Sequence, residues 1–167
     1  MIIGSILENI DLEKRISITP DVAKKYITNG FKIILQKNYG SHLGFKDKEY
    51  ENEGCDFAEK IEVINKSDII LQLNLPDDTV LNKLNQNQTL IGVFNVHENI
   101  NKLKSLSNKK INIFSLELLP RITRAQSMDI LSSQANLAGY KAVIESFSIF
   151  EKAIPMMMTA AGTIPAA

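Results

Sequence analysis

Short apolar runs bounded by turn residues recur along the first two thirds of the chain. Runs of about four to eight apolar residues are typical of strands that are buried on both faces of a parallel sheet. The pattern therefore predicts a series of buried strands. They are expected at residues 2–7, 31–36, 67–75, 89–94 and 111–115.

Helical periodicity fills several of the intervals between these runs. Thr19 and Pro20 predict the start of a helix, because threonine is a good N-cap and proline suits the first helical turn. Gly30 is expected to end that helix. Residues 47–53 predict a polar helix, and residues 99–107 predict a helix with its apolar side chains on one face.

Strands that alternate with helices indicate βαβ units, which form parallel sheets with right-handed crossovers. The sequence therefore predicts an α/β protein with a Rossmann-like (flavodoxin-like) doubly wound parallel sheet. In such a sheet, ligands bind at the carboxyl ends of the strands. A chain of 167 residues is long enough to bury a sizeable core in one domain.

The last third of the chain has a different pattern. Residues 118–129 predict a polar loop, and residues 130–151 predict a long helix. The candidates for the buried stripe of that helix are Leu131, Ala135, Ala138, Ala142 and Phe150. Residues 156–167 are apolar without a polar cap, which is typical of an interior segment, so the sequence is expected to be a piece of a longer protein.

Composition excludes several classes of function. The 19 basic and 19 acidic side chains give a formal net charge of zero, whereas a nucleic-acid-binding protein needs a clustered basic excess. The single cysteine, Cys55, can form neither an internal disulfide nor a cysteine-rich metal site. No metal site is predicted, because His42 and His97 lie far apart and carboxylates would have to supply most of the ligands.

The sequence also bears on the compartment. It contains no apolar run of about 18 residues, which is the length needed to span a bilayer. Its first residues lack the basic segment and uninterrupted apolar segment of a signal peptide. The chain is therefore expected to be cytoplasmic, with no direct membrane span.

The densest group of polar side chains lies in residues 120–129, which hold two arginines, a glutamine and an aspartate. Arginine offers a planar fork of donors for phosphate or carboxylate, and glutamine both donates and accepts, as a carboxamide ligand requires. A solvated loop whose aspartate caps the next helix is the competing interpretation. Arg15 follows the first predicted strand, where parallel sheets bind anions, but an ordinary exposed arginine is more frequent there.

Other reactive side chains are better explained by ordinary structural roles. His97 follows the fourth predicted strand and could act as an acid or base, although a loop histidine is more often solvated. Cys55 is expected to be an inert thiol, because no basic neighbour lowers its pKa. The methionines of residues 156–158 are expected to serve packing. The sequence contains neither G-x-G-x-x-G nor G-x-x-x-x-G-K-[ST], so it has no phosphate-binding loop motif of its own.

Four segments, in order, carry a resemblance to a known family. These are R-I-S-I-T-P, P-R-I-T-R-A-Q-S-M-D, S-S-Q-A-N-L-A-G-Y and M-M-T-A-A-G-T-I-P, at residues 15–20, 120–129, 132–140 and 157–165. Together they resemble the N-terminal part of the alpha subunit of proton-translocating NAD(P) transhydrogenases, in the alanine dehydrogenase/pyridine nucleotide transhydrogenase superfamily. The similarity runs along the whole chain, and residues 120–140 are its most specific part.

The resemblance implies a two-lobed NAD(H)-binding component. Residues 1–130 would form the N-terminal lobe, residues 131–152 a long interdomain helix, and residues 153–167 the entry to a second, nucleotide-binding Rossmann lobe that is absent from this chain. The loop of residues 120–129 would lie against the nicotinamide of NAD(H), and no side chain would be catalytic. The implied cofactor-binding residues are Arg121, Ile122, Thr123, Arg124, Gln126, Asp129 and Ser132.

The family also implies partners and a reaction. The complete enzyme would transfer a hydride from NADH to NADP⁺, coupled to proton translocation, with NADP(H) on a partner domain. This chain alone, which lacks the glycine turn for the ADP half, is expected to bind NAD(H) weakly or not at all. Its partners would be the membrane-spanning and NADP(H)-binding components and a second copy in a homodimer, at the cytoplasmic face of the inner membrane.

Two departures from the superfamily bear on the alternatives. Alanine dehydrogenases hold the substrate carboxylate with a lysine at the position of Gln72, and they use a histidine near the position of Asn95 as acid or base. Their absence here weakens the alternative of an alanine dehydrogenase-like lobe. A truncated, non-catalytic assembly module is the third possibility.

Overall fold

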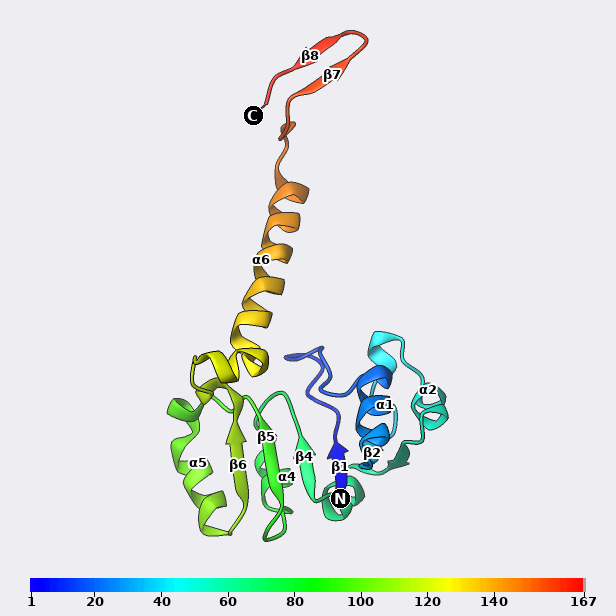
Figure 1. Ribbon diagram of the computed structural model, residues 1–167, viewed down its shortest axis with the longest axis vertical. Helices are drawn as coiled ribbons and strands as arrows, with labels where there is room; N and C mark the ends of the chain where they lie inside the picture. The colour runs from blue at the N-terminus through cyan, green and yellow to red at the C-terminus, as the bar shows by residue number, and fades with distance from the viewer. Residues whose placement is uncertain (167) are drawn as a thin grey trace. The chain divides into compact units, whose positions relative to one another are not determined.

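The computed structural model describes residues 1–166, which form two compact units (Figure 1). Unit 1 comprises Met1–Pro120, and unit 2 begins at Arg121. Each unit is described separately below.

Unit 1 is built on a six-stranded parallel sheet in the order β3-β2-β1-β4-β5-β6. The strands are β1 (Ile2–Ser5), β2 (Lys32–Gln36), β3 (Asp56–Ala58), β4 (Ile69–Leu71), β5 (Thr89–Gly92) and β6 (Asn112–Ser115). The order reverses between β1 and β4, which lie side by side at the centre of the sheet (Figure 1). In doubly wound folds the ligand crevice lies at this switch point.

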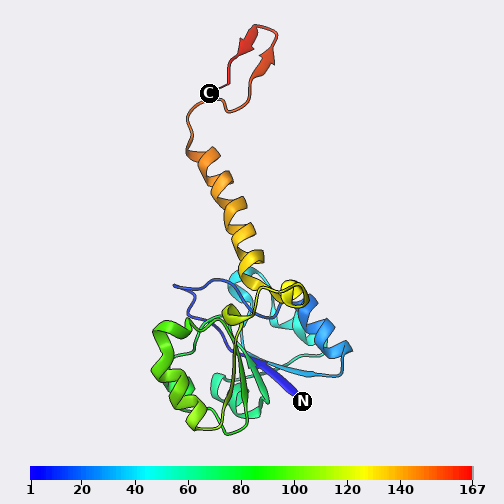
Figure 2. The same ribbon diagram turned by 60° about the vertical axis from the view of Figure 1, so that its left-hand side comes forward.

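Helices cover the sheet from both sides, and in the view of Figure 2 the sheet stands between the green α5 and the blue α1. The helices of unit 1 are α1 (Pro20–Thr28), α2 (Asp47–Asn52), α3 (Lys60–Lys66), α4 (Asp78–Leu81) and α5 (Val96–Asn108), with short 3₁₀ turns η1 (Ser41–Leu43) and η2 (Leu116–Leu118). Helices α3, α4 and α5 contribute to one apolar cluster, and α1 and α2 contribute to the other.

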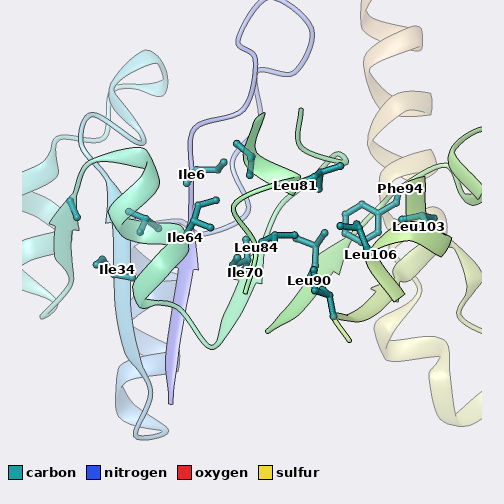
Figure 3. Packing of buried hydrophobic residues seen from close by; sticks show 14 residues of the cluster. Ile6, Ile34, Ile64, Ile70, Leu81, Leu84, Leu90, Phe94, Leu103 and Leu106 are labelled. Carbon is teal, nitrogen blue, oxygen red and sulfur yellow. The ribbon is translucent and has the colours of Figure 1, made fainter. Parts of the chain in front are cut away.

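Alternation along the strands explains why the apolar runs fold this way. In β2, Ile34 belongs to the cluster beneath α3, α4 and α5, whereas Ile33 and Leu35 belong to the cluster beneath α1 and α2. Successive side chains of a strand point to opposite faces, so a continuous apolar run can be buried only in a sheet covered on both faces. Figure 3 shows the first cluster, in which Ile70 and Leu90 come from neighbouring strands and Leu106 from α5.

The predicted signals at the ends of α1 are confirmed. The Thr19 hydroxyl accepts a hydrogen bond from the N–H of Val22 at 3.4 Å, and Pro20 occupies the first helical position. Gly30 follows the helix with φ of +87°, a left-handed conformation that glycine adopts without steric cost. The helix therefore begins where expected and ends just before the glycine.

The structure corrects several predicted boundaries. The strand predicted at residues 67–75 is shorter, because β4 covers Ile69–Leu71 and the N–H of Leu73 donates to the Glu8 side chain. The helix predicted at residues 99–107 begins earlier, at Val96. The strand β3 and the helices α3 and α4 were not predicted. The doubly wound α/β fold is confirmed, in the Rossmann order rather than the flavodoxin order.

Unit 2 contains a 3₁₀ segment, a long helix and a hairpin. These are η3 (Thr123–Met128), α6 (Ile130–Ile149), and the antiparallel strands β7 (Met157–Thr159) and β8 (Gly162–Ile164). The long helix is confirmed, but all five residues proposed for its buried stripe are exposed, including Phe150 just after the helix, because no element of unit 2 that the structure describes packs over that stripe. Apolar side chains such as Leu131, Leu137 and Val143 lie around much of the circumference of α6. Within residues 1–166, no helix is both long and apolar enough to cross a membrane.

Candidate functional site

The predicted binding residues lie where η3 joins α6, within unit 2. Six of the seven line one open hollow of about 330 Å³: Arg121, Ile122, Thr123, Gln126, Asp129 and Ser132. The remaining predicted residue, Arg124, is exposed and does not line it. Residues 120–129, which the sequence predicted to be a polar loop, thus contain a 3₁₀ turn beside the hollow.

Backbone hydrogen bonds hold this turn in place. The N–H of Ala125 donates to the carbonyl of Ile122 at 2.9 Å, and the N–H of Asp129 donates to the carbonyl of Gln126 at 3.3 Å. Ala125, at the centre of this turn, is buried. The exposed side chains around the hollow are therefore presented from a defined backbone.

Asp129 joins the turn to the helix. Its Oδ1 accepts the N–H of Ser132 at 3.0 Å, and its Oδ2 accepts the Ser132 hydroxyl at 2.7 Å. These hydrogen bonds from Ser132, with the charge of Arg121, lower the pKa of the Asp129 carboxyl. Asp129 is therefore ionised at neutral pH, and it both caps α6 and places a fixed negative charge in the hollow.

The chemistry available in the hollow is that of binding. Arg121 provides donors, Gln126 both donates and accepts, and Thr123 adds a hydroxyl. The residues that line the hollow include no histidine, cysteine or lysine. The site can orient a polar planar group, and its one described hydroxyl–carboxylate pair, Ser132 with Asp129, forms the cap of α6.

A larger hollow, of about 560 Å³, lies in unit 1 at the switch point of the sheet, where β1 and β4 end. Glu8, which follows β1, reaches the segment after β4: its Oε1 accepts the N–H of Leu73 at 2.7 Å and the side-chain amide of Gln72 at 3.0 Å. Sequence reasoning missed Glu8, because its partners lie more than sixty residues away along the chain.

Gln72 is buried and fully engaged. Its Oε1 accepts the N–H of Ile6 at 2.9 Å and lies 3.2 Å from the Ser5 hydroxyl, while its amide donates to Glu8. Ser5 in turn contacts the buried hydroxyl of Tyr39 at 2.8 Å. The glutamine thus closes a polar network between the central strands.

Arg15 lies at the rim of the same region. Its guanidinium donates to both oxygens of Glu13, from Nε at 2.8 Å and from a terminal nitrogen at 2.6 Å. This bond from Arg15 lowers the pKa of Glu13 from its ordinary value of 4.5 to about 2. Burial has the opposite effect on Glu8, whose pKa is raised despite the N–H groups of Leu73 and Asn74.

The Glu13 shift predicts an acid-dependent loss of stability. A carboxyl whose pKa is depressed in the folded state contributes stability that is present above its ordinary value of 4.5 and is lost as the pH falls toward about 2. For this partly exposed pair we expect about 1 kcal/mol. Urea denaturation between pH 5 and pH 2 should show that E13Q loses less stability than wild type. Equal pH dependence of the two proteins would contradict the assignment.

The other candidates occupy ordinary positions. His97 is exposed in the first turn of α5. His42 lies in η1, where its Nε2 is 2.7 Å from the carbonyl of Lys14. Burial raises the pKa of the Cys55 thiol to about 11, as expected for an inert cysteine. The described residues contain no group of three or more histidine, cysteine or acidic side chains that could hold a metal ion.

Sequence comparison identifies the family of the chain. Residues 5–138 match the family described as alanine dehydrogenase/PNT, N-terminal domain. The chain belongs to this family. The match begins at the last residue of β1 and includes β2 to β6 and the turn that carries the candidate hollow, so the alanine dehydrogenase/PNT domain includes both hollows described above.

Within the family, the similarity to transhydrogenases is the stronger one. The chain is 39% identical to a NAD(P) transhydrogenase alpha-subunit protein of Rickettsia prowazekii and 37% identical to one of Rhodospirillum rubrum, over 99% and 93% of its own length. It spans less than half of these relatives, 45% and 42%. An alanine dehydrogenase of Staphylococcus aureus is 22% identical over 86% of the chain.

Among solved structures, a transhydrogenase is again more similar to the chain than an alanine dehydrogenase is. A transhydrogenase from Sinorhizobium meliloti superposes on the whole chain with a TM-score of 0.91 and 35% identity, and the chain covers 50% of it. An L-alanine dehydrogenase superposes on 70% of the chain with a TM-score of 0.65 at 16% identity, which shows a shared fold. The chain thus resembles the N-terminal part of a transhydrogenase alpha subunit.

Proposed function

We propose that this chain is the N-terminal lobe of the NAD(H)-binding component of a proton-translocating NAD(P) transhydrogenase. The observation that carries the proposal is the hollow at the start of α6. Five residues of the loop 120–129 and Ser132 of α6 line this hollow. The identity to transhydrogenase alpha subunits along nearly the whole chain supports it.

The residues of the hollow fit the nicotinamide end of NAD(H). A carboxamide needs both a donor and an acceptor, which Gln126 supplies, and ribose hydroxyls need acceptors such as Asp129. Arg121 lies on the same hollow and adds positive charge near Asp129. In this proposal Ile122 and Thr123 shape the wall, Ser132 fixes Asp129, and Arg124 borders the loop.

The nicotinamide would supply the redox chemistry: a hydride leaves NADH and is accepted by NADP⁺ held on a partner domain. The side chains of this chain would bind and orient, because direct transfer between two rings needs no general acid or base. A site with arginine, glutamine and aspartate but without a histidine suits that task.

The alternative of an alanine dehydrogenase-like lobe is less well supported. That chemistry needs cationic side chains for a substrate carboxylate and a group that moves a proton. Here the guanidinium of Arg15 is bound by the carboxylate of Glu13, and Gln72 is engaged with Ile6 and Glu8. The larger hollow is lined by the carboxylates of Glu8, Glu13 and Asp77. The cation that lines it, Lys60, lies 3.3 Å from Asp77, so this lining is not prepared for a substrate carboxylate.

The wider assembly is part of the same proposal. Residues 1–130 would form the lobe, 131–152 the interdomain helix and 153–167 the entry to a second Rossmann lobe. Partner components would bind NADP(H) and span the membrane, with this component at the cytoplasmic face and paired in a homodimer. The exposed apolar side chains of α6 are consistent with burial in a larger protein.

Substitution of Arg121 in the complete NAD(H)-binding subunit tests the proposed function. R121A should weaken NADH binding by about ten- to a hundredfold, the loss expected for a hydrogen bond from a charged donor. K141A is the matched control, because Lys141 is a cation of α6 outside the hollow that pairs with Glu145. NADH binding is measured by fluorescence titration, and hydride transfer in the assembled enzyme.

The outcomes separate the candidate functions. Weaker binding in R121A with an unchanged K141A supports the proposal. Unchanged binding in R121A contradicts the assignment of the loop. Reduction of pyruvate with NADH and ammonia by the complete subunit would favour the alanine dehydrogenase alternative. A subunit that binds no nucleotide but assembles stably would favour the assembly module.

A further inference from the structure

Glu117 is a charged residue whose role neither the sequence pattern nor the proposed site explains. It lies in η2, directly after β6, and is partly buried. Its carboxylate points to the neighbouring strand end: Oε1 accepts the N–H of Phe94 at 3.2 Å and that of Val96 at 3.2 Å. Oε2 lies 3.3 Å from the same Phe94 nitrogen. The carboxylate therefore binds the turn between β5 and α5.

The backbone of this turn is shaped as an anion site. Asn95 stands between the two donors with φ of +47° and ψ of +60°, the left-handed conformation. Backbone N–H groups that flank a left-handed residue converge on one point and form a concavity that binds anions. The Asn99 side chain donates to the carbonyl of Phe94 at 2.9 Å and holds the turn from its other side. The anion in this concavity is the chain's own Glu117.

The position of Glu117 along the chain gives this contact a second consequence. β6 is an edge strand that pairs only with β5, and its exposed residues include Phe114. The N–H of Leu119 donates to the carbonyl of Leu116 at 3.2 Å and closes η2. Pro120 and Arg121 follow at once. A contact that holds η2 in place therefore also holds the first residues of the loop that contains Arg121.

We propose that Glu117 is a positioning residue, whose carboxylate, seated on the Phe94 and Val96 N–H groups, anchors the start of the loop that carries Arg121. This inference rests on the proposed function for its effect on NADH, but the anchoring itself does not. Glu117 contacts neither the hollow nor, in this proposal, the nucleotide.

Limited digestion with trypsin tests the anchoring in the full chain of 167 residues. In E117A, cleavage after Arg121 should be about tenfold faster than in wild type, because loss of a charged hydrogen-bonded contact increases local opening by about that factor. Sodium acetate, compared with sodium chloride at equal ionic strength, should fill the vacated anion site but leave the cleavage fast, because free acetate does not join η2 to the turn between β5 and α5. Only an acceptor attached to η2, as in E117Q, should restore part of the slow cleavage.

E98A is the matched control, since Glu98 carries the same charge in the first turn of α5, the helix whose first N–H group Glu117 binds. E98A should be cleaved at the wild-type rate, with or without acetate. In E117A, the amide resonances of Phe94 and Val96 should shift on titration with acetate. Should E117A fail to fold, E117Q keeps one acceptor oxygen and is expected to give a smaller increase in cleavage.

Two results would overturn the inference: wild-type cleavage after Arg121 in both E117A and E117Q, or amides of Phe94 and Val96 that ignore acetate in a folded E117A. In the complete subunit, E117A should bind NADH less tightly, and E117Q should recover part of the affinity. Wild-type affinity in E117A would reject the positioning effect. Accelerated cleavage in E117A with partial recovery in E117Q, together with a wild-type subunit that binds no NADH, would support the anchoring and reject the proposed function.

Discussion

Replacement of Gly92 by alanine should lower the free energy of unfolding by about 3 kcal/mol, at the upper end of the usual cost of overpacking a core. Gly92 is the last residue of β5, and a Cβ atom there would lie 2.3 Å from the backbone carbonyl oxygen of Gln72 and 2.6 Å from the Phe94 ring. The first neighbour is backbone and cannot rotate away. For a chain of this size the melting temperature should fall by about 6–12 °C.

Gly139 provides the control for this prediction. It lies in α6 and has no atom within 4 Å of the position that a Cβ would take. G139A should leave thermal unfolding of the sheet unchanged and raise the helix content slightly, since alanine is the better helix former by about 1 kcal/mol. A melting temperature of G92A equal to that of G139A would show that β4 and β5 can separate at no cost.

Replacement of Gln72 by a charged residue should have the second large effect on stability. The size of the loss should depend on whether the new charge is negative or positive. Q72E places a second carboxylate beside Glu8, in a position that is 4% exposed. We expect a loss of about 3 kcal/mol at pH 7, in the range for an unpaired buried charge. Q72K should cost about 1 kcal/mol, because the ammonium group can pair with Glu8 while the N–H of Ile6 loses its acceptor.

The pH dependence of these variants checks the cause. Two adjacent carboxyls raise each other's pKa in the folded state, so the penalty in Q72E is present above the raised pKa and is relieved as the pH falls through it. Urea denaturation at pH 7 and pH 5 should show that Q72E regains stability on acidification, whereas Q72K does not. An equal loss in both variants would point to the lost hydrogen bonds of the amide rather than to charge.

Local signals in the sequence were sufficient to predict elements with caps of their own. Helix α1 has its Thr19 and Pro20 start and its Gly30 stop, and β2 has three consecutive apolar residues, 33–35, at its centre. The missed β3 and α3 are only 3 and 7 residues long. Elements of that length are not stable alone, and their conformation is decided by packing, as Val63 and Ile64 of α3 show in the core.

The same distinction holds at the candidate site. Residues 120–132 are neighbours in sequence, so their gathering around one hollow was predictable from the segment itself. The contacts of Glu8 with Leu73 and of Glu117 with Phe94 join residues 65 and 23 positions apart. Each depends on which strands become adjacent, and periodicity does not determine strand order. The exposure of α6 was likewise missed, because an apolar pattern predicts burial but not the partner that provides it.

The central place of β1 also affects how the chain folds as it leaves the ribosome. β1 is made well before β4, yet one of its edges pairs with β4, which ends at Leu71. Until that residue has emerged, β1, β2 and β3 can form only a part of the sheet, with an open apolar edge at Ile3. Open strand edges favour association with other chains. The period between synthesis of β2 and of β4 is therefore when the nascent chain has the greatest need of a chaperone.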